Sequence, residues 1–161
     1  MTETEAKKIG RKLGLKSALI GLTIAQIIMT SFFIGDGLLK AFFWFADFSY
    51  NLNLAVASLL LLACGYYFGG KAGMQILIQK KESSWVGFKF CFLTLFVTSF
   101  FASLIGFFQE GVKNIGTDDN PFEDYLFKPM FWVLLFGILP VVAVGFWLGR
   151  KIEKQDEKYM H

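Results

Sequence analysis

Four stretches of this sequence, each about as long as a bilayer is thick, carry almost no charged residues. They cover about residues 17–35, 52–70, 85–108 and 130–149, and Lys89 is the one charge inside them. An α-helix rises ~1.5 Å per residue, so ~20 residues cross the ~30 Å hydrocarbon core. None of the stretches has the polar stripe of a helix on the surface of a soluble protein. We therefore predict an all-α integral membrane protein, a bundle of four transmembrane helices, over a very hydrophobic soluble bundle.

These stretches and their connections use nearly the whole chain, which we treat as a single transmembrane domain over residues 1–161. The first apolar stretch is longer than the ~7–15-residue core of a signal peptide, so we interpret it as a retained span. The remaining parts are two tails, 1–16 and 150–161, and two outer loops, 36–51 and 109–129.

The basic residues lie almost entirely on one side of this arrangement. Of 16 lysines and arginines, only Lys40, Lys113 and Lys128 fall in the outer loops. Because cytoplasmic loops carry an excess of Lys and Arg, both chain ends are expected in the cytoplasm. The membrane expected is the cytoplasmic (inner) membrane of a bacterium. Cys64 and Cys91 then lie toward the cytoplasmic side, where we expect buried free thiols and no disulfide.

The two outer loops differ in character. The segment 36–51 is apolar and aromatic, which predicts a short interfacial helix or helical extension; a re-entrant, pore-lining segment is the alternative. In the segment 109–129, the residues Asp118 to Pro121 are of the types that favour a turn, so a turn is expected there. Carboxylates there could attract a cation, but they lack the ligand order of a calcium loop, so a solvated loop is expected. These acidic residues are Asp118, Asp119, Glu123 and Asp124.

The second and fourth spans end alike. Ala63–Lys71 and Ala143–Lys151 share the pattern A-x-G-aromatic-aromatic-x-G-x-K, and the first and third spans share Thr-Ser-Phe-Phe. This predicts two tandem helical hairpins, although chance is an alternative in a chain with 20 phenylalanines. The glycines of the pattern form small-xxx-small pairs, which allow close helix contacts inside one bundle or between copies. They are Gly65, Gly69, Gly145 and Gly149.

The spans offer little material for catalysis. An ionisable residue in the membrane suggests a functional site, and none lies at mid-depth. The polar candidates are better suited to hydrogen bonds between helices: Gln26, Thr30, Ser31, Thr98 and Ser99. The one histidine is His161, and no nucleophile–base pair or cofactor motif is present. We expect no enzyme activity, no cofactor, no metal and no nucleic-acid partner.

The sequence thus predicts a non-catalytic multi-pass subunit whose partners are the lipid bilayer, further copies of itself, or another protein. It would be an oligomeric scaffold, anchor or sensor component of a larger system, such as bacterial defence or immunity. A small oligomeric channel or transporter is the first alternative. A lipid-modifying enzyme is the second, with few acid–base groups available to it. Basic residues in both tails are the candidates for contact with lipid headgroups or a partner: Lys7, Lys8, Arg11, Lys12, Arg150 and Lys151.

Overall fold

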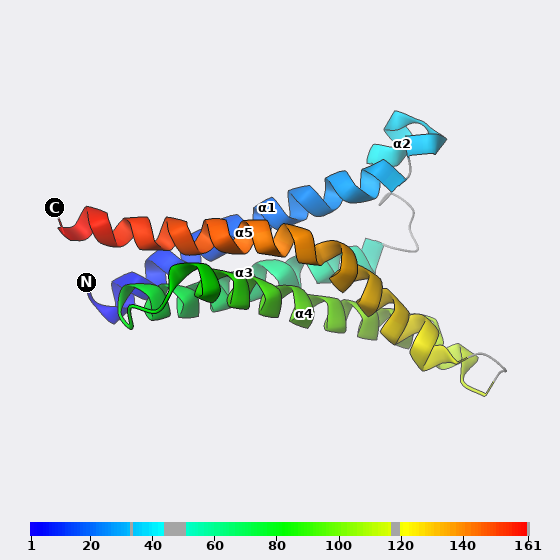
Figure 1. Cartoon of the computed structure of the whole chain (residues 1–161). Helices are drawn as coiled ribbons and strands as arrows, with labels where there is room; N and C mark the ends of the chain where they lie inside the picture. The colour runs from blue at the N-terminus through cyan, green and yellow to red at the C-terminus, as the bar shows by residue number, and fades with distance from the viewer. Residues whose placement is uncertain (33, 44–50, 117–119, 161) are drawn as a thin grey trace.

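The computed structural model describes residues 1–32, 34–43, 51–116 and 120–160, and it consists of four long helices with short helical turns between them (Figure 1). Each long helix contains an 18-residue window that is apolar enough to cross a membrane. The described part of the chain contains no strand. This confirms the predicted all-α chain with four helices able to span a bilayer. The helices are α1 (Glu3–Phe32), α3 (Asn51–Leu77), α4 (Ser83–Gln109) and α5 (Lys128–Met160).

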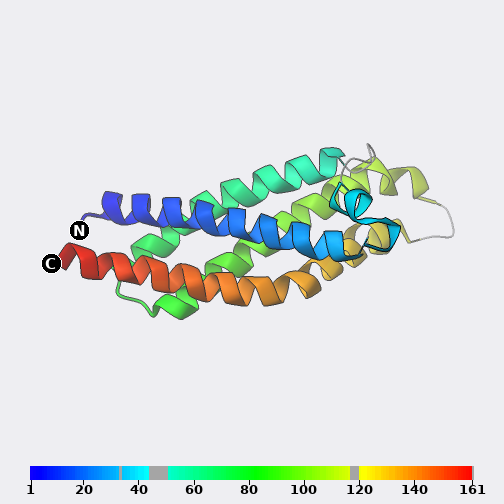
Figure 2. The ribbon, with the colours of Figure 1, turned by 90° about the horizontal axis from the view of Figure 1, so that it is seen from above.

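Neighbouring helices follow one another around the bundle. α1 packs beside α3, α3 beside α4, α4 beside α5, and α5 again beside α1. Both ends of the chain and the α3–α4 turn lie at the same end of the bundle (Figures 1 and 2). We call it the basic end, because it holds the residues of both basic tails, and we call the other the opposite end.

Short helical turns occupy the opposite end. η1 and α2 follow α1, while η3 and η4 join α4 to α5. Gly37 separates η1 from α2 with a φ of +100°, a conformation that favours glycine. The aromatic residues of segment 44–50, together with Asp47, lie outside the described residues. The bounds are η1 (Ile34–Asp36), α2 (Leu38–Phe42), η3 (Gly111–Asn114) and the π-helical η4 (Glu123–Phe127).

The two basic tails are helical. α1 begins at Glu3, where Thr2 and Glu5 cap it reciprocally: the Thr2 N–H donates to Glu5 Oε2 at 2.8 Å, and the Glu5 N–H donates to Thr2 Oγ1 at 3.3 Å. α5 likewise continues well past its apolar stretch. Both helices therefore extend beyond the apolar part of the bundle at the basic end.

Candidate functional site

α1 and α3 touch backbone to backbone through glycines. A Cβ added to Gly14 would lie 2.6 Å from the Cα of Gly69, and one added to Gly73 would lie 2.9 Å from the Cα of Gly10. A Cβ on Gly65 would lie 2.7 Å from the Cβ of Ala18. No larger residue fits at these distances, so the small residues set how closely the two helices approach.

α4 and α5 meet in the same manner. A Cβ on Gly145 would lie 2.7 Å from the Cα of Phe88, and one on Gly87 would lie 2.7 Å from the backbone nitrogen of Gly149. The structure therefore places Gly65 and Gly69 against α1, and Gly145 and Gly149 against α4, all within one chain. Their partners, Gly10, Gly14 and Gly87, were not among the predicted packing residues. The signal for α1 was available in the small residues at positions 6, 10, 14 and 18, which recur every four residues from the segment expected to be a tail into the first apolar stretch.

The basic end has a core to which all four helices contribute. The side chains of Ala6 and Ile152 are completely buried, although both lie outside the apolar stretches. Polar contacts reinforce the core at its edge: Ser83 Oγ donates to Glu153 Oε2 at 2.8 Å, and Lys80 forms an ion pair with Asp156. The basic end is therefore closed and well packed. The core residues are Ala6, Ala72, Ile76, Leu77, Val86, Phe90, Leu148 and Ile152.

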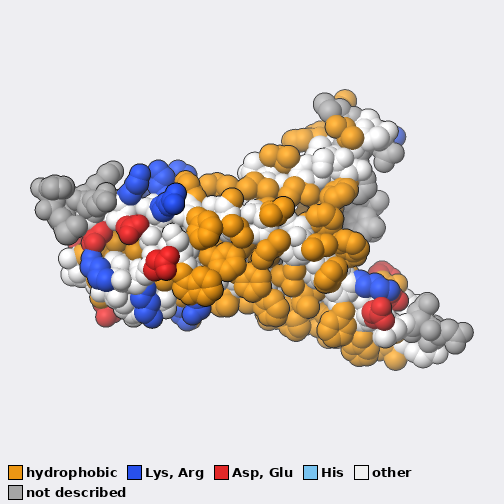
Figure 3. Space-filling view, viewed as in Figure 1, with side chains coloured by type: hydrophobic (Ala, Val, Ile, Leu, Met, Phe, Trp, Pro, Cys, Tyr) orange, Lys and Arg blue, Asp and Glu red, His pale blue; other side chains and the backbone are white. Residues whose placement is uncertain are grey.

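The predicted contact residues form a basic surface around this core. Lysines and arginines gather at the basic end, beside the apolar surface of the middle of the bundle (Figure 3). The Arg11 guanidinium lies 5.0 Å from the ring centroid of Tyr66, and Lys7 pairs with Glu3 at 3.6 Å. Of the predicted contact residues, the exposed ones are Lys8, Arg11 and Lys12 on α1, and Arg150 and Lys151 on α5.

The predicted polar contacts do not converge on one site. Gln26 Nε2 on α1 donates to the Phe42 carbonyl at 2.9 Å, which ties α1 to α2, and lies 3.5 Å from Thr30 Oγ1. Ser31 and Ser99 donate to carbonyls of their own helices at 2.6 and 2.9 Å. The buried Thr98 Oγ1 has no hydrogen-bond partner among the described residues. None of the described hydrogen bonds joins the α1 candidates to those on α4.

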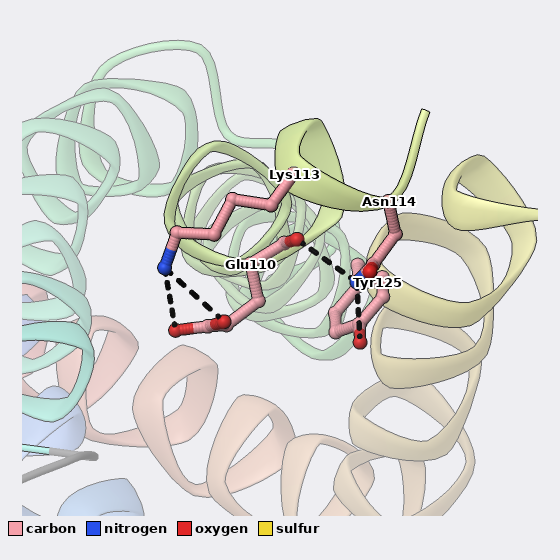
Figure 4. Close-up of polar contacts among 4 residues, drawn as sticks. All are labelled: Glu110, Lys113, Asn114 and Tyr125. Carbon is pink, nitrogen blue, oxygen red and sulfur yellow. Dashed lines mark hydrogen bonds and ion pairs between the residues drawn. The ribbon is translucent and has the colours of Figure 1, made fainter. Parts of the chain in front are cut away.

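A small polar network holds the connection at the opposite end together (Figure 4). Asn114 Nδ2 donates to the Glu110 carbonyl at 3.2 Å and to the Tyr125 hydroxyl at 3.1 Å, while Lys113 pairs with Glu110 at 3.4 Å. Glu123 and Asp124 both pair with Lys128, at 3.5 and 2.6 Å. The other two predicted acidic residues, Asp118 and Asp119, lie outside the described residues. In the described ranges, no three potential metal ligands cluster.

An apolar cavity of about 480 Å³ lies between the four helices, beside the packed core. Phe68 and Phe90 stack with ring centroids 6.0 Å apart and are among its lining residues nearest the basic end. Its two hydroxyl-bearing residues, Ser17 and Thr94, donate to carbonyls of their own helices at 2.7 and 2.8 Å. The cavity therefore presents almost no free polar group. The sequence analysis did not identify it, because it arises from how the helices diverge.

No protein family, no curated protein and no solved structure matches this chain.

Proposed function

We propose that this chain is a non-catalytic membrane subunit that works through contacts, made chiefly by its basic end. The observation that carries the proposal is the closed core at that end. α1 and α5 continue past their apolar stretches, and Ala6 and Ile152 are buried there between all four helices. The result is a stiff, basic platform that projects from the apolar part of the bundle, which is the shape that suits a docking surface.

The platform faces the cytoplasm in this proposal. Support comes from the distribution of Lys and Arg, which leaves only Lys40, Lys113 and Lys128 near the opposite end. The close glycine contacts of α1 with α3 and of α4 with α5 support two hairpins inserted in the same orientation. Both chain ends then lie on the cytoplasmic side.

The apolar cavity favours contact over transport. A pore for ions or polar solutes needs polar groups along its path. In the described residues, the hydroxyls of Ser17 and Thr94 are directed to backbone carbonyls, and the rest of the wall is almost wholly apolar. A scaffold, anchor or sensor component is therefore the proposed role, with an acidic partner surface or a second copy on the platform.

Orientation is tested by labelling single cysteines in intact cells with a maleimide that does not cross membranes, in a background that lacks Cys64 and Cys91. Lys8→Cys and Lys154→Cys should react only after the membrane is permeabilised, while Lys113→Cys should react at once. The reverse pattern would overturn the proposed orientation.

Docking is tested by site-specific photocrosslinking in cells, with the photoreactive residue at Lys8 or Lys151 and, as a matched control, at Lys113. Discrete adducts are expected at the first two positions and should disappear when Lys12 and Arg150 are changed to Glu. An adduct of twice the chain's mass would identify a second copy as the partner. Identical adducts at all three positions, unaffected by charge reversal, would contradict the docking role.

A further inference from the structure

We propose that the apolar cavity binds an acyl chain of an anionic membrane lipid, whose headgroup lies against lysines and arginines at the basic end. The chemistry of the wall selects the ligand class. Aliphatic and aromatic side chains line it, and the hydroxyls of Ser17 and Thr94 donate hydrogen bonds to carbonyls of their own helices. A cavity of about 480 Å³ falls within the ~300–1,000 Å³ typical of ligand sites. An apolar ligand suits it, and hydrocarbon chains surround the bundle.

The cavity is elongated along the bundle. Its lining residues run from Ser17 to Met29 on α1 and from Pro129 to Leu148 on α5. At ~1.5 Å per residue these stretches measure about 18 and about 28 Å, longer than one ~15 Å leaflet of hydrocarbon. An acyl chain that runs along the membrane normal can therefore lie lengthwise in this elongated cavity, which we call the slot.

A lipid chain can enter the slot from the side. Three residues on its α5 wall, Trp132, Val133 and Phe136, are about half exposed, so the slot reaches the surface of the bundle. α1 and α5 diverge toward the opposite end (Figure 1), where the rings of Phe32 and Phe136 still touch edge to face at 5.4 Å. The stacked Phe68 and Phe90 line the part of the slot nearest the basic end.

Charge at the basic end of the slot complements an anionic headgroup. On α1 and on α4, an exposed basic residue stands next to a lining residue in the part of the slot nearest the basic end. On α4, the Lys89 amine lies 5.9 Å from the ring centroid of Phe90, which lines the slot. The nearest described carboxylate on α5, Glu153, accepts a hydrogen bond from Ser83. The two basic residues are Lys16, next to Ser17, and Lys89, next to Phe90.

The test uses Trp132 as a reporter, in a variant whose other tryptophans (Trp44, Trp85 and Trp147) are phenylalanine. The protein is reconstituted into phosphatidylcholine bilayers with increasing fractions of brominated phosphatidylglycerol or brominated phosphatidylcholine, which quench nearby tryptophans. Quenching by the anionic lipid should saturate, with half-saturation at a mole fraction at least threefold lower than for the neutral lipid. Lys16→Gln with Lys89→Gln should remove that preference.

Gly21 provides the variant that fills the slot. It lines the cavity, and a Cβ there would meet no atom within 4 Å. Gly35 is equally open but lies outside the lining, so Gly35→Leu is the matched control. Gly21→Leu should abolish the saturable quenching and Gly35→Leu should preserve it. Ala25→Leu fills the same slot independently, and thermal unfolding in detergent verifies that each variant folds.

Quenching that rises linearly with lipid fraction, alike for both headgroups and unchanged in Gly21→Leu, would mean only bulk lipid contact and would overturn the proposal. Loss of a dimer in native mass spectra of Gly21→Leu would assign the slot to a second copy and also overturn it. Crosslinking at Lys8 and Lys151 reports on the platform separately. A negative result in the lipid experiment therefore does not contradict the proposed docking role. A negative result in the crosslinking experiment likewise does not contradict the lipid site.

Discussion

The half of the bundle near the basic end and the half near the opposite end contain the same four helices but pack them differently. Toward the basic end, glycines such as Gly14 and Gly69 bring backbones into contact, and Ile152 is completely buried. Toward the opposite end, α4 still packs against α5, with Ser99 and Phe107 buried. α1 instead faces a cavity there: a Cβ on Gly21 would meet no atom within 4 Å, and Leu139 on α5 is 77% exposed.

The two halves pack differently because the basic end is surrounded by water and the other half by hydrocarbon. The basic end extends past the apolar stretches, so burial of Ala6 and Ile152 there gains the hydrophobic driving force of water. Within hydrocarbon this force is absent, and helix association depends more on close packing, which small residues permit. Exposure of Leu139 or Ile27 to lipid has no hydrophobic cost, so α1 and α5 can remain apart in the half near the opposite end.

The largest loss of stability is expected when a large side chain is placed in the close glycine contact between α1 and α3. Gly14→Leu places a side chain where even a Cβ would lie 2.6 Å from the Cα of Gly69. We expect a loss of about 3 kcal/mol or more in the free energy of unfolding, measured by denaturant titration in detergent micelles. Gly21→Leu is the matched control on the same helix and should unfold like the unmodified chain. An equal loss of unfolding free energy in both variants would contradict the proposed difference in packing between the two halves.

Ile152→Ala tests the core of the basic end with a smaller change. Removal of a fully buried side chain leaves a cavity, so a loss of about 2–4 kcal/mol is expected in the same titration. Leu139→Ala removes a similar volume from an exposed position and should change stability by less than ~0.5 kcal/mol. If Leu139→Ala costs as much stability as Ile152→Ala, the Leu139 side chain is packed in the protein and the proposed difference between the two halves is wrong.

The smallest effect is expected at the edge of the basic end. Lys80 and Asp156 join the α3–α4 turn to α5, but the Lys80 side chain is largely exposed. Exposed ion pairs contribute ~0.2–1 kcal/mol, so Lys80→Gln should lower the unfolding free energy by about 0.5 kcal/mol, less so at high salt. Lys113→Gln, whose pair with Glu110 lies within the opposite end, is the control. A loss above ~2 kcal/mol would show that the platform depends on this ion pair more than on its apolar core.

The long apolar stretches alone were enough to predict four helices able to cross a membrane, because length and hydropathy are local properties. The helical tails were harder to foresee. Charges at Lys7, Lys8 and Arg11 concealed the spacing of small residues that packs α1 against Gly65 and Gly69. The sequence singled out those two glycines, but partner helices are a property of the fold.

The cavity could not be read from the sequence at all. Its wall combines residues from all four helices, and no local pattern records where helices diverge. Gly21 and Pro140 were the nearest signals, since both leave space or bend a helix where the wall forms.

The central claim, a closed basic end joined to an open apolar half, can be measured by electron spin resonance distances between two spin labels. Both pairs join α1 to α5, in a chain whose Cys64 and Cys91 are replaced by alanine and which is reconstituted in bilayers. One pair is placed at Lys8 and Lys154, and the other at Ile27 and Leu139, all of them exposed positions.

We expect a single narrow distance distribution for the pair at Lys8 and Lys154, because the packed core allows one arrangement. The pair at Ile27 and Leu139 should give a distribution at least twice as broad, which narrows in Gly21→Leu as the slot is filled. Equally narrow distributions for both pairs, unchanged by Gly21→Leu, would contradict the account.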